Sequence, residues 1–232
     1  MNKTYLEPSE VTRLEKAASN TRDRLLVRIL FHLGCRVSEA IALTIDDIDL
    51  VQGKITIQHL KTRVKITCPN CGLRLAKAHT YCPGCGCKVE QAVTKAQEHR
   101  RVRALPIDGD TLEILQHFIK KGGPVSKNGK QMLFGINRHR AWQIVNECAE
   151  RSGLGDLLNP ETGKKRGISP HRLRDAFAVN AVKHDDSGDG LRLLQEQLGH
   201  QSFNTTARYR KVAGEELRQW YGKLWKKDED SG

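Results

Sequence analysis

Residues 169–209 read SPHRLRDAFAVNAVKHDDSGDGLRLLQEQLGHQSFNTTARY, and they carry most of the information about the architecture. The proline at position 170, directly after a serine, is typical of a helix start. The apolar spacing that follows predicts three helices, at about 170–184, 191–198 and 203–209. His171 and Arg174 stand three positions apart, so they share one face of the first of these helices.

Two more polar side chains follow at helix ends in this stretch. Leu198-Gly199-His200 ends the second helix at a glycine and presents a histidine there. Tyr209 stands on the short third helix, nine residues later. Taken singly, each residue has an ordinary explanation, since His171 can be a helix cap and Tyr209 a core aromatic residue. Their meaning therefore depends on what accompanies them elsewhere in the chain.

An arginine takes a similar position near the start of the chain. Residues 21–33, TRDRLLVRILFHL, predict a strongly apolar helix, and Gly34 can end it in a left-handed conformation. In the following GCRVSEA, Arg36 stands at the start of the next helix, although alone it could be one surface arginine among many. Further helices are expected from Pro8 onward and at about 37–43, 110–121, 137–152 and 214–226.

The pattern changes in the first third of the chain. Residues 45–50 and 54–57 alternate like short strands around a Gln-Gly turn. Residues 101–107, RVRALPI, are expected to return as a strand of the same sheet. We therefore predict an α+β protein that is mostly helical, with one small sheet. Loops rich in Gly, Lys and Asn are expected at 122–130 and 153–168.

A cysteine-rich stretch separates these strands. It holds two copies of C-P-x-C-G, with ten residues between Cys71 and Cys82, and each copy places two thiolates on a tight turn. Two such turns supply the four-sulfur cage that structural zinc requires, with no coordination position left open. We predict one structural zinc, with redox dithiol pairs as the alternative, and its ligands are Cys68, Cys71, Cys82 and Cys85. Nearby spare donors are His79, Cys87 and His99, whereas Cys35 and Cys148 are expected in the core.

The charge balance indicates a polyanionic partner. The 232 residues include 39 Lys or Arg and 27 Asp or Glu, a net charge of +12. Each basic group that neutralises a phosphate releases condensed counterions, so nucleic acid is favoured over a membrane surface. The sequence has no apolar run of membrane-spanning length, and its first twenty residues lack the apolar core of a signal peptide. Seven cysteines without an export signal favour metal binding over disulfides, and we expect a cytoplasmic location.

Four separated motifs occur in a fixed order, namely G-x-R-x-S-E at 34–39, H-x-x-R at 171–174, L-G-H at 198–200 and T-x-x-x-Y at 205–209. In this order they resemble the tyrosine recombinase, or phage-integrase, family. The resemblance covers about residues 5–225, apart from the cysteine-rich insert. It implies the family's catalytic fold, mostly helical with a small three-stranded antiparallel sheet.

The resemblance also implies a domain organisation. Residues 1–232 correspond to the catalytic domain of the family. A four-cysteine zinc ribbon, residues 66–97, is inserted in the hairpin between the second and third strands. The N-terminal core-binding domain with which the family usually clamps DNA is expected to be absent.

For five residues the resemblance implies a role in the attack of a phenol on a DNA phosphodiester. Arg36 and Arg174 would bind non-bridging phosphate oxygens, and His200 would donate a further hydrogen bond to the same phosphate. His171 would hold or relay the proton of Tyr209, because a phenol with a pKa of about 10 is a poor nucleophile unaided. The product is a 3′-phosphotyrosyl bond that a 5′-hydroxyl can reverse, and this chemistry needs no cofactor.

A sixth catalytic residue in the family is a lysine on the hairpin, the general acid for the leaving 5′-oxygen. Lys61, in QHLKTR, corresponds to it, and Lys65 and Lys95 are alternatives because the insert begins and ends there. The family's hairpin turn is short, whereas about 30 residues intervene here. Asp175 follows Arg174 where many relatives have histidine, and no role is inferred for it.

Double-stranded DNA is the partner that the resemblance implies, with no membrane and no small-molecule substrate. Residues 214–226 carry an apolar stripe of Leu217, Trp220, Tyr221, Leu224 and Trp225. Because the last helix of the family often docks into a neighbouring protomer, a homo-tetramer on DNA is expected, although this helix could pack on its own chain. The implied function is a site-specific recombinase or integrase of a mobile element.

Two other functions remain open from the sequence. A type IB topoisomerase or a hairpin-forming resolvase has the same active-site residues, and relaxation of supercoils by monomers would favour it. A non-enzymatic, zinc-containing DNA-binding regulator is the second alternative. Such a regulator would be expected to have lost at least one catalytic residue, and all six are present.

Overall fold

The computed structural model describes residues 4–76, 79–89, 93–159 and 162–210, except for the side chains of 59–65 and 93–101 within two strands. The chain divides into two compact units. The helical unit comprises residues 1–57 and 103–232, and the inserted unit comprises residues 58–102. Among the described residues, no helix is both long enough and apolar enough to cross a membrane.

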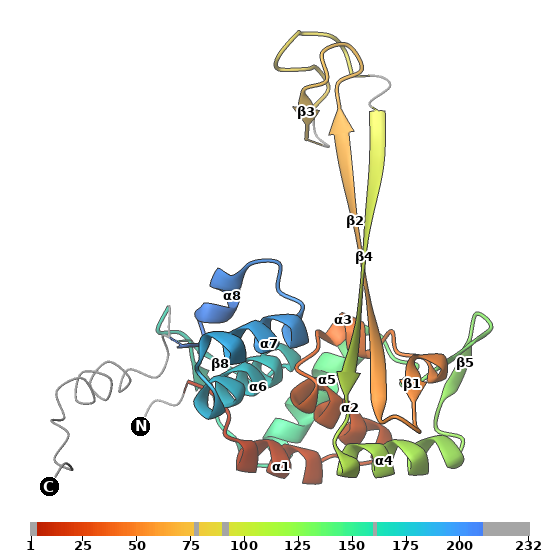
Figure 1. Ribbon diagram of the computed structural model, residues 1–232, viewed down its shortest axis with the longest axis vertical. Helices are drawn as coiled ribbons and strands as arrows, with labels where there is room; N and C mark the ends of the chain where they lie inside the picture. Colours follow the sequence, from red (N-terminus) through yellow and green to blue (C-terminus); the bar gives the residue numbers. More distant parts are fainter. Residues whose placement is uncertain (1–3, 77–78, 90–92, 160–161, 211–232) are drawn as a thin grey trace, which may run out of the picture. The chain divides into compact units, whose positions relative to one another are not determined.

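Eight α-helices lie among the described residues of the helical unit (Figure 1). Their bounds are α1 Pro8–Lys16, α2 Thr21–His32, α3 Val37–Ala40, α4 Gly109–Lys120, α5 Arg138–Arg151, α6 Pro170–His184, α7 Gly188–Leu198 and α8 Phe203–Ala207. A short 3₁₀ turn, Ile45–Asp47, follows α3. Every helix expected within the described residues is confirmed, and the one expected at 214–226 lies outside them.

Three helix ends differ from the prediction by two or three residues. Helix α7 begins at Gly188, three residues earlier than expected, because the Ser187 hydroxyl accepts a hydrogen bond from Gly190 N at 3.0 Å and caps the first turn. Helix α3 ends at Ala40. Helix α8 ends at Ala207, so Tyr209 lies in the turn after the helix.

The main sheet has four strands, where the sequence predicted three. β1 (Ile48–Asp49) pairs antiparallel with β2 (Lys54–Thr67), and β4 (Val93–Pro106) pairs with β2 (Figure 1). The fourth strand is β3 (Arg74–Leu75), two residues of the inserted unit that pair with the far end of β2. β2 and β4 have 14 residues each, so they run well beyond the expected 54–57 and 101–107.

Two short ribbons occupy segments that were expected to be loops. β5 (Val125–Lys127) pairs with β6 (Lys130–Met132), and β7 (Leu157–Leu158) pairs with β8 (Lys165–Arg166). The turn between β5 and β6 is Asn128-Gly129, and both residues have positive φ, 53° and 73°. This is the geometry that a two-residue hairpin favours, and Asn-Gly is its strongest sequence signal.

Helix α2 is the centre of the core. Its Leu25, Leu26 and Ile29 are fully buried, and the helix packs against α1, α4, α5 and α6. Cys35 and Cys148 are both buried in the same core, as expected. A second apolar cluster lies between α6 and α7, and the ring of Tyr209 packs against it. The core thereby fixes the ends of α2, α6 and α7, from which the candidate site is built.

Candidate active site and metal centre

Arg174 is the anchor of the candidate active site. It lies on the first turns of α6 and is 3 % exposed. Its Nη1 donates to the carbonyl of Gly34 at 2.7 Å, and its Nη2 donates to the carbonyl of Leu198 at 2.8 Å. Those carbonyls stand where α2 and α7 end, so the guanidinium ties together three helices. Burial, with the nearby charge of Arg36, lowers the pKa of Arg174 to about 10, which leaves it charged at neutral pH.

Arg36 is the second arginine and is more accessible. It caps the start of α3, and its side chain is 36 % exposed. Its Nη1 donates to Glu39 Oε1 at 3.0 Å, and its backbone N–H donates to Glu39 Oε2 at 2.9 Å. Burial alone would raise the pKa of Glu39, but the Arg36 N–H and the charges of Arg103 and Arg36 lower it. The carboxylate therefore stays ionised and orients Arg36.

Arg103, on β4, is a third arginine that the sequence did not single out. Its Nη2 donates to Glu39 Oε2 at 2.9 Å, and its Nη1 donates to the carbonyl of Gln197 at 2.8 Å. A Cβ on Gly199 would stand 2.4 Å from Arg103 Nη1, and Gly199 has φ +64°. The glycine of L-G-H is therefore required both by backbone conformation and by the close approach of Arg103.

His200 lies between Arg174 and the segment that carries Tyr209. Its Nε2 is 3.0 Å from Arg174 Nη2, and its Nδ1 is 2.9 Å from Thr206 Oγ1. Because guanidinium groups only donate, Nε2 accepts and Nδ1 carries the proton. Burial, followed by the charges of Arg174 and Arg36, lowers the pKa of His200 to about 4. The ring is thus neutral at pH 7, with both nitrogens engaged.

Tyr209 stacks on His200, with ring centroids 6.3 Å apart and an interplanar angle of 13°. Its hydroxyl donates to Asp175 Oδ1 at 2.9 Å. Burial first, and then the charge of Asp175, raises the pKa of Tyr209 above its usual range. His171 Nε2 lies 3.7 Å from the same carboxylate oxygen, and the His171 side chain is 74 % exposed. Asp175, which the sequence left without a role, is therefore the direct partner of the predicted nucleophile.

Five of the six predicted catalytic residues thus meet in one cluster of the helical unit. These are Arg36, His171, Arg174, His200 and Tyr209. The sixth, Lys61, belongs to β2 in the inserted unit, and its side chain lies outside the described ones. The same holds for the alternatives Lys65 and Lys95, so the assignment of the general acid stays a prediction.

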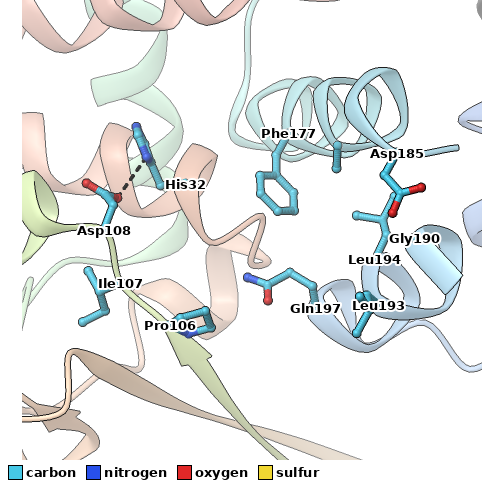
Figure 2. A pocket seen from close by; sticks show the side chains of 11 residues that line it. His32, Pro106, Ile107, Asp108, Phe177, Asp185, Gly190, Leu193, Leu194 and Gln197 are labelled. Atoms are coloured by element: carbon cyan, nitrogen blue, oxygen red, sulfur yellow. Dashed lines mark ion pairs between the residues drawn. The ribbon is translucent and has the colours of Figure 1, made fainter.

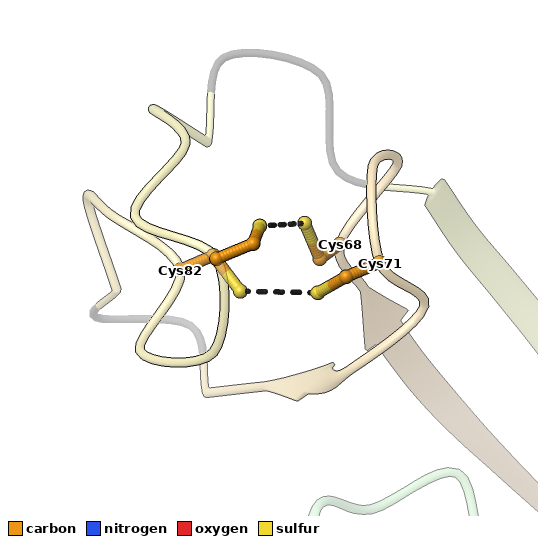
Figure 3. Close-up of side chains that lie close together, drawn as sticks. Cys68, Cys71 and Cys82 are labelled. Carbon is orange, nitrogen blue, oxygen red and sulfur yellow. Dashed lines mark hydrogen bonds between the residues drawn. The ribbon is translucent and has the colours of Figure 1, made fainter.

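The four predicted metal ligands also meet. The Sγ atoms of Cys68, Cys71, Cys82 and Cys85 all lie within 4.8 Å of one another (Figure 3). The Sγ atoms of Cys68 and Cys85 are 3.7 Å apart, and those of Cys71 and Cys82 are 3.5 Å apart. A tetrahedral zinc with Zn–S distances of about 2.3 Å requires sulfurs about 3.8 Å apart, so this donor set fits zinc.

The two turns that carry these cysteines have the same backbone geometry. Gly72 N donates to Cys68 O at 2.9 Å, and Gly86 N donates to Cys82 O at 2.9 Å. Cys87 adds a fifth thiol, with its Sγ 3.2 Å from Cys68 Sγ and 3.4 Å from Cys85 Sγ. Of the other spare donors, His79 accepts at Nδ1 from Ala76 N at 3.2 Å, and the His99 side chain lies outside the described ones.

A separate cavity of about 590 Å³ lies beside α2, α6 and α7 (Figure 2). Apolar side chains such as Phe177, Leu193 and Leu194 line it, and an ion pair of His32 Nδ1 with Asp108 Oδ2 at 3.1 Å lies at one side. None of the six predicted catalytic residues is among the eleven that line this cavity. The cavity is therefore distinct from the cluster around Arg174.

Comparisons with known proteins agree with this geometry. The sequence model of the Phage integrase family matches residues 4–82 and 86–216. Tyrosine recombinase XerD of Bifidobacterium longum is 30 % identical over 230 residues, covering 93 % of this chain and 60 % of the relative. XerD of Neisseria meningitidis serogroup B is 28 % identical over 223 residues, covering 90 % of this chain and 59 % of the relative. The chain thus spans about 60 % of the length of these relatives.

Solved structures show the same fold. The crystal structure of XerA recombinase has a TM-score of 0.63 at 20 % identity, covering 97 % of this chain and 65 % of that one. XerH site-specific recombinase bound to its difH substrate, in a pre-cleavage complex, has a TM-score of 0.59 at 21 % identity, covering 94 % and 53 %. The matched family, the shared fold and the clustered motif residues lead to one conclusion. The chain belongs to the phage integrase family of tyrosine recombinases.

Proposed function

We propose that this chain is a site-specific DNA recombinase or integrase that cleaves and rejoins DNA through a 3′-phosphotyrosyl intermediate. The observation that carries the proposal is the cluster around the buried Arg174. A charged guanidinium, a second arginine and a tyrosine hydroxyl converge there in a chain with a net charge of +12. Such a cluster suits a phosphodiester that gains negative charge as it is attacked.

The two arginines bind the non-bridging oxygens of the scissile phosphate. A guanidinium has five N–H donors, and three hydrogen bonds to Gly34, Leu198 and His200 occupy three of those of Arg174. Two donors are left for a phosphate, on a group that cannot rotate away. Arg36, held by Glu39 and partly exposed, supplies the second fork. Both groups are in place before the reaction, so little reorganisation is needed in the transition state.

Tyr209 is the nucleophile. Its Oη forms a bond to phosphorus while the bond from phosphorus to the 5′-oxygen breaks, and the phenolic proton passes to a base beside it. Lys61 donates a proton to the departing 5′-oxygen. His200 accepts a hydrogen bond from Arg174 at Nε2, which holds the guanidinium in place. To donate a hydrogen bond to the phosphate, His200 must first carry a proton on Nε2, either by protonation of the ring or by a change of tautomer. Attack by a 5′-hydroxyl on the phosphotyrosyl bond reverses each transfer and restores Tyr209.

Zinc plays a structural part in this proposal. Cys68, Cys71, Cys82 and Cys85 hold one zinc in the insert of residues 66–97, and the closed four-sulfur set leaves no position for a substrate. When bound, the metal supplies folding free energy to a segment with a very small apolar cluster, Cys68, Leu75 and Cys82. The strand-transfer chemistry needs neither this metal nor another cofactor.

Assembly completes the proposal. The partner is double-stranded DNA, and four copies act on two duplexes, joined through the segment 214–226, which lies outside the described residues. The complex of XerH with its difH substrate supports DNA as the partner, since that recombinase shares the fold. The proposed tetramer follows from the need to exchange strands between two duplexes.

Capture of covalent DNA in cells tests the proposed function. The chain is purified under denaturing conditions, the DNA that remains attached is sequenced, and the adduct is mapped by mass spectrometry. We expect one recurring site, linked through Tyr209. Tyr209→Phe keeps the ring and the stack on His200 but lacks the attacking oxygen, so it should bind DNA and yield no adduct. An adduct on the Phe variant, or none on the wild type, would overturn the proposal.

A further inference from the structure

We propose that Asp175 is a further catalytic residue, the base that accepts the phenolic proton of Tyr209 as the phenol attacks the phosphate. The inference rests on the proposed function and specifies how its nucleophile is activated. From the sequence, His171 was expected to hold or relay the proton of Tyr209. In the structure, the carboxylate of Asp175 lies nearer to this proton. The base thus stands one position after Arg174, on the same turn of α6.

The contact has the geometry of a general base and its acid. The Tyr209 hydroxyl donates to Asp175 Oδ1 at 2.9 Å. This distance lies within the range of about 2.6–3.2 Å that such a pair requires. Asp175 is 7 % exposed, and α6 fixes its backbone. The O–H points at the carboxylate, so the lone pairs of the phenolic oxygen remain available to phosphorus.

Two basic side chains lie near this carboxylate. Arg172 Nη1 lies 3.7 Å from Asp175 Oδ2, and His171 Nε2 lies 3.7 Å from Oδ1. The charge of Arg174 also acts on the phenol from α6, His200 stacks on its ring from the end of α7, and Tyr5 acts on it from the N-terminal segment. Among these groups Asp175 is the one that both contacts the hydroxyl and carries a negative charge, so it is the one placed to take the proton.

Proton transfer is needed during the attack. Burial and the charge of Asp175 raise the pKa of Tyr209, so very little phenolate is present at pH 7. The proton therefore leaves as the bond from Oη to phosphorus forms, and it moves to Asp175 Oδ1. The bond from phosphorus to the 5′-oxygen breaks, and the proton for that oxygen comes from the general acid. The reverse reaction returns the proton from Asp175 to Tyr209. An aspartate accepts a substrate hydroxyl proton in the same way in protein kinases.

Asp175→Asn is the decisive variant, because the amide oxygen can still accept the hydrogen bond but cannot take the proton. Its substrate is a duplex with the sequence captured by the wild type and with sulfur in place of the scissile bridging 5′-oxygen, so that no general acid is required. Single-turnover cleavage is measured from pH 6 to 10. We expect a loss of about 10²–10⁴-fold at pH 7. The rate of the variant should then rise about tenfold per pH unit as the phenol ionises, whereas the wild-type rate is flat.

Two matched variants define the alternatives. Asp189→Asn removes an equal charge from an exposed site on α7 and should cleave at the wild-type rate. His171→Asn should not reproduce the rise with pH. If His171→Asn shows that rise and Asp175→Asn does not, the base is His171. If Asp175→Asn cleaves faster than the wild type, the hydrogen bond between Tyr209 and Asp175 inhibits cleavage. Either result overturns the proposal.

A readout without DNA separates this inference from the proposed function. The ultraviolet absorbance of phenolate is titrated, and Tyr209 is isolated by subtracting the Tyr209→Phe curve. Asp175→Asn should lower the pKa of Tyr209, since the adjacent negative charge is gone, and an unchanged pKa would overturn the contact. A wild type that forms no covalent adduct would overturn the proposed function. An adduct that Asp175→Asn forms as fast as the wild type would overturn only the role of Asp175.

Discussion

Gly199 shows how one residue links the backbone to the active site. It ends α7 with φ +64°, a conformation in which other residues are strained, and Arg103 fills the space where a Cβ would stand. The next residue is His200, so any shift of this turn moves a group that contacts Arg174. The glycine of L-G-H is thereby explained by its packing against Arg103 and by its position next to His200.

Replacing this glycine should be costly. Gly199→Ala places a side chain in the left-handed conformation and displaces Arg103, so we expect the free energy of unfolding to fall by at least about 1–2 kcal/mol. Urea denaturation measures the change. Gly188→Ala is the matched control, because a Cβ at that position of the same helix meets nothing within 4 Å. Its effect should stay within about 0.5 kcal/mol. Equal losses in both variants would contradict the assigned role of Arg103.

The role of Lys61 as general acid can be tested by changing the leaving group of the reaction. An alkoxide leaves badly without a proton, whereas a thiolate leaves readily because thiols ionise near pH about 8.5. Lys61→Ala should therefore cleave normal DNA about 10²–10⁴-fold more slowly and recover most of its rate on a bridging 5′-sulfur substrate. Lys65→Ala and Lys95→Ala are the controls at the two ends of the insert. If the sulfur substrate restores the cleavage rate of Lys65→Ala or Lys95→Ala, and not that of Lys61→Ala, the general acid is the lysine replaced in that variant.

The sequence predicted individual site residues where motifs carry them. Arg36, Arg174, His200 and Tyr209 stand in motifs with a fixed spacing, and the structure brings them together. Asp175 lies directly after the H-x-x-R motif, but its proposed role depends on a contact across 34 positions with Tyr209. Arg103 has no motif at all, because its importance arises from pairing with Glu39, 64 positions earlier. Such long-range contacts have no signature in local spacing.

Among the elements, the helices were predictable and the strands less so. Helix periodicity and caps such as Ser187 are local, and the predicted helices agree with the structure within a few residues. β2 and β4 extend to 14 residues because they pair with each other. The apolar alternation of Ile55 and Ile57 is interrupted at Gln58-His59 and resumes out of phase at Leu60, so one unbroken run ends at Ile57. The hairpin at Asn128-Gly129 has a clear local signal, which a prediction from loop composition alone does not use.

The two cysteine turns are expected to act together as one zinc site. Wild-type chain should contain one zinc, and replacing Cys68 and Cys85 together with serine should remove it, as measured by elemental analysis. Without the metal the insert should become sensitive to limited proteolysis, because zinc supplies its folding free energy directly. Cys87→Ser is the matched control, since it removes a neighbouring thiol outside the four-sulfur set and should retain zinc. Loss of zinc in the control, or wild-type chain with disulfides and no zinc, would refute the assignment.

At the scale of the whole molecule, the positive charge is unevenly divided. The inserted unit, residues 58–102, holds nine Lys or Arg and two Glu, a net charge of +7 out of +12. A zinc bound by four thiolates would lower this by two, to +5. The remaining 187 residues carry the other +5. The inserted unit thus has the higher charge density even when the metal is bound, which favours phosphate contacts there.

Salt dependence of DNA binding tests this division. Each phosphate contact contributes about −0.9 to the slope of log affinity against log salt, so the wild type should bind with a steep slope. Arg74 and Lys88 are exposed in the inserted unit, and replacing both with glutamine should make the slope shallower by up to about 1.8. Arg13→Gln with Lys16→Gln removes the same charge from α1 and should have a smaller effect. The measurement is fluorescence anisotropy on a labelled duplex from low to physiological salt. A DNA affinity that does not change with salt would contradict phosphate contacts by this protein. If the α1 variant changes the slope more than the variant of the inserted unit, the contacts lie on the helical unit.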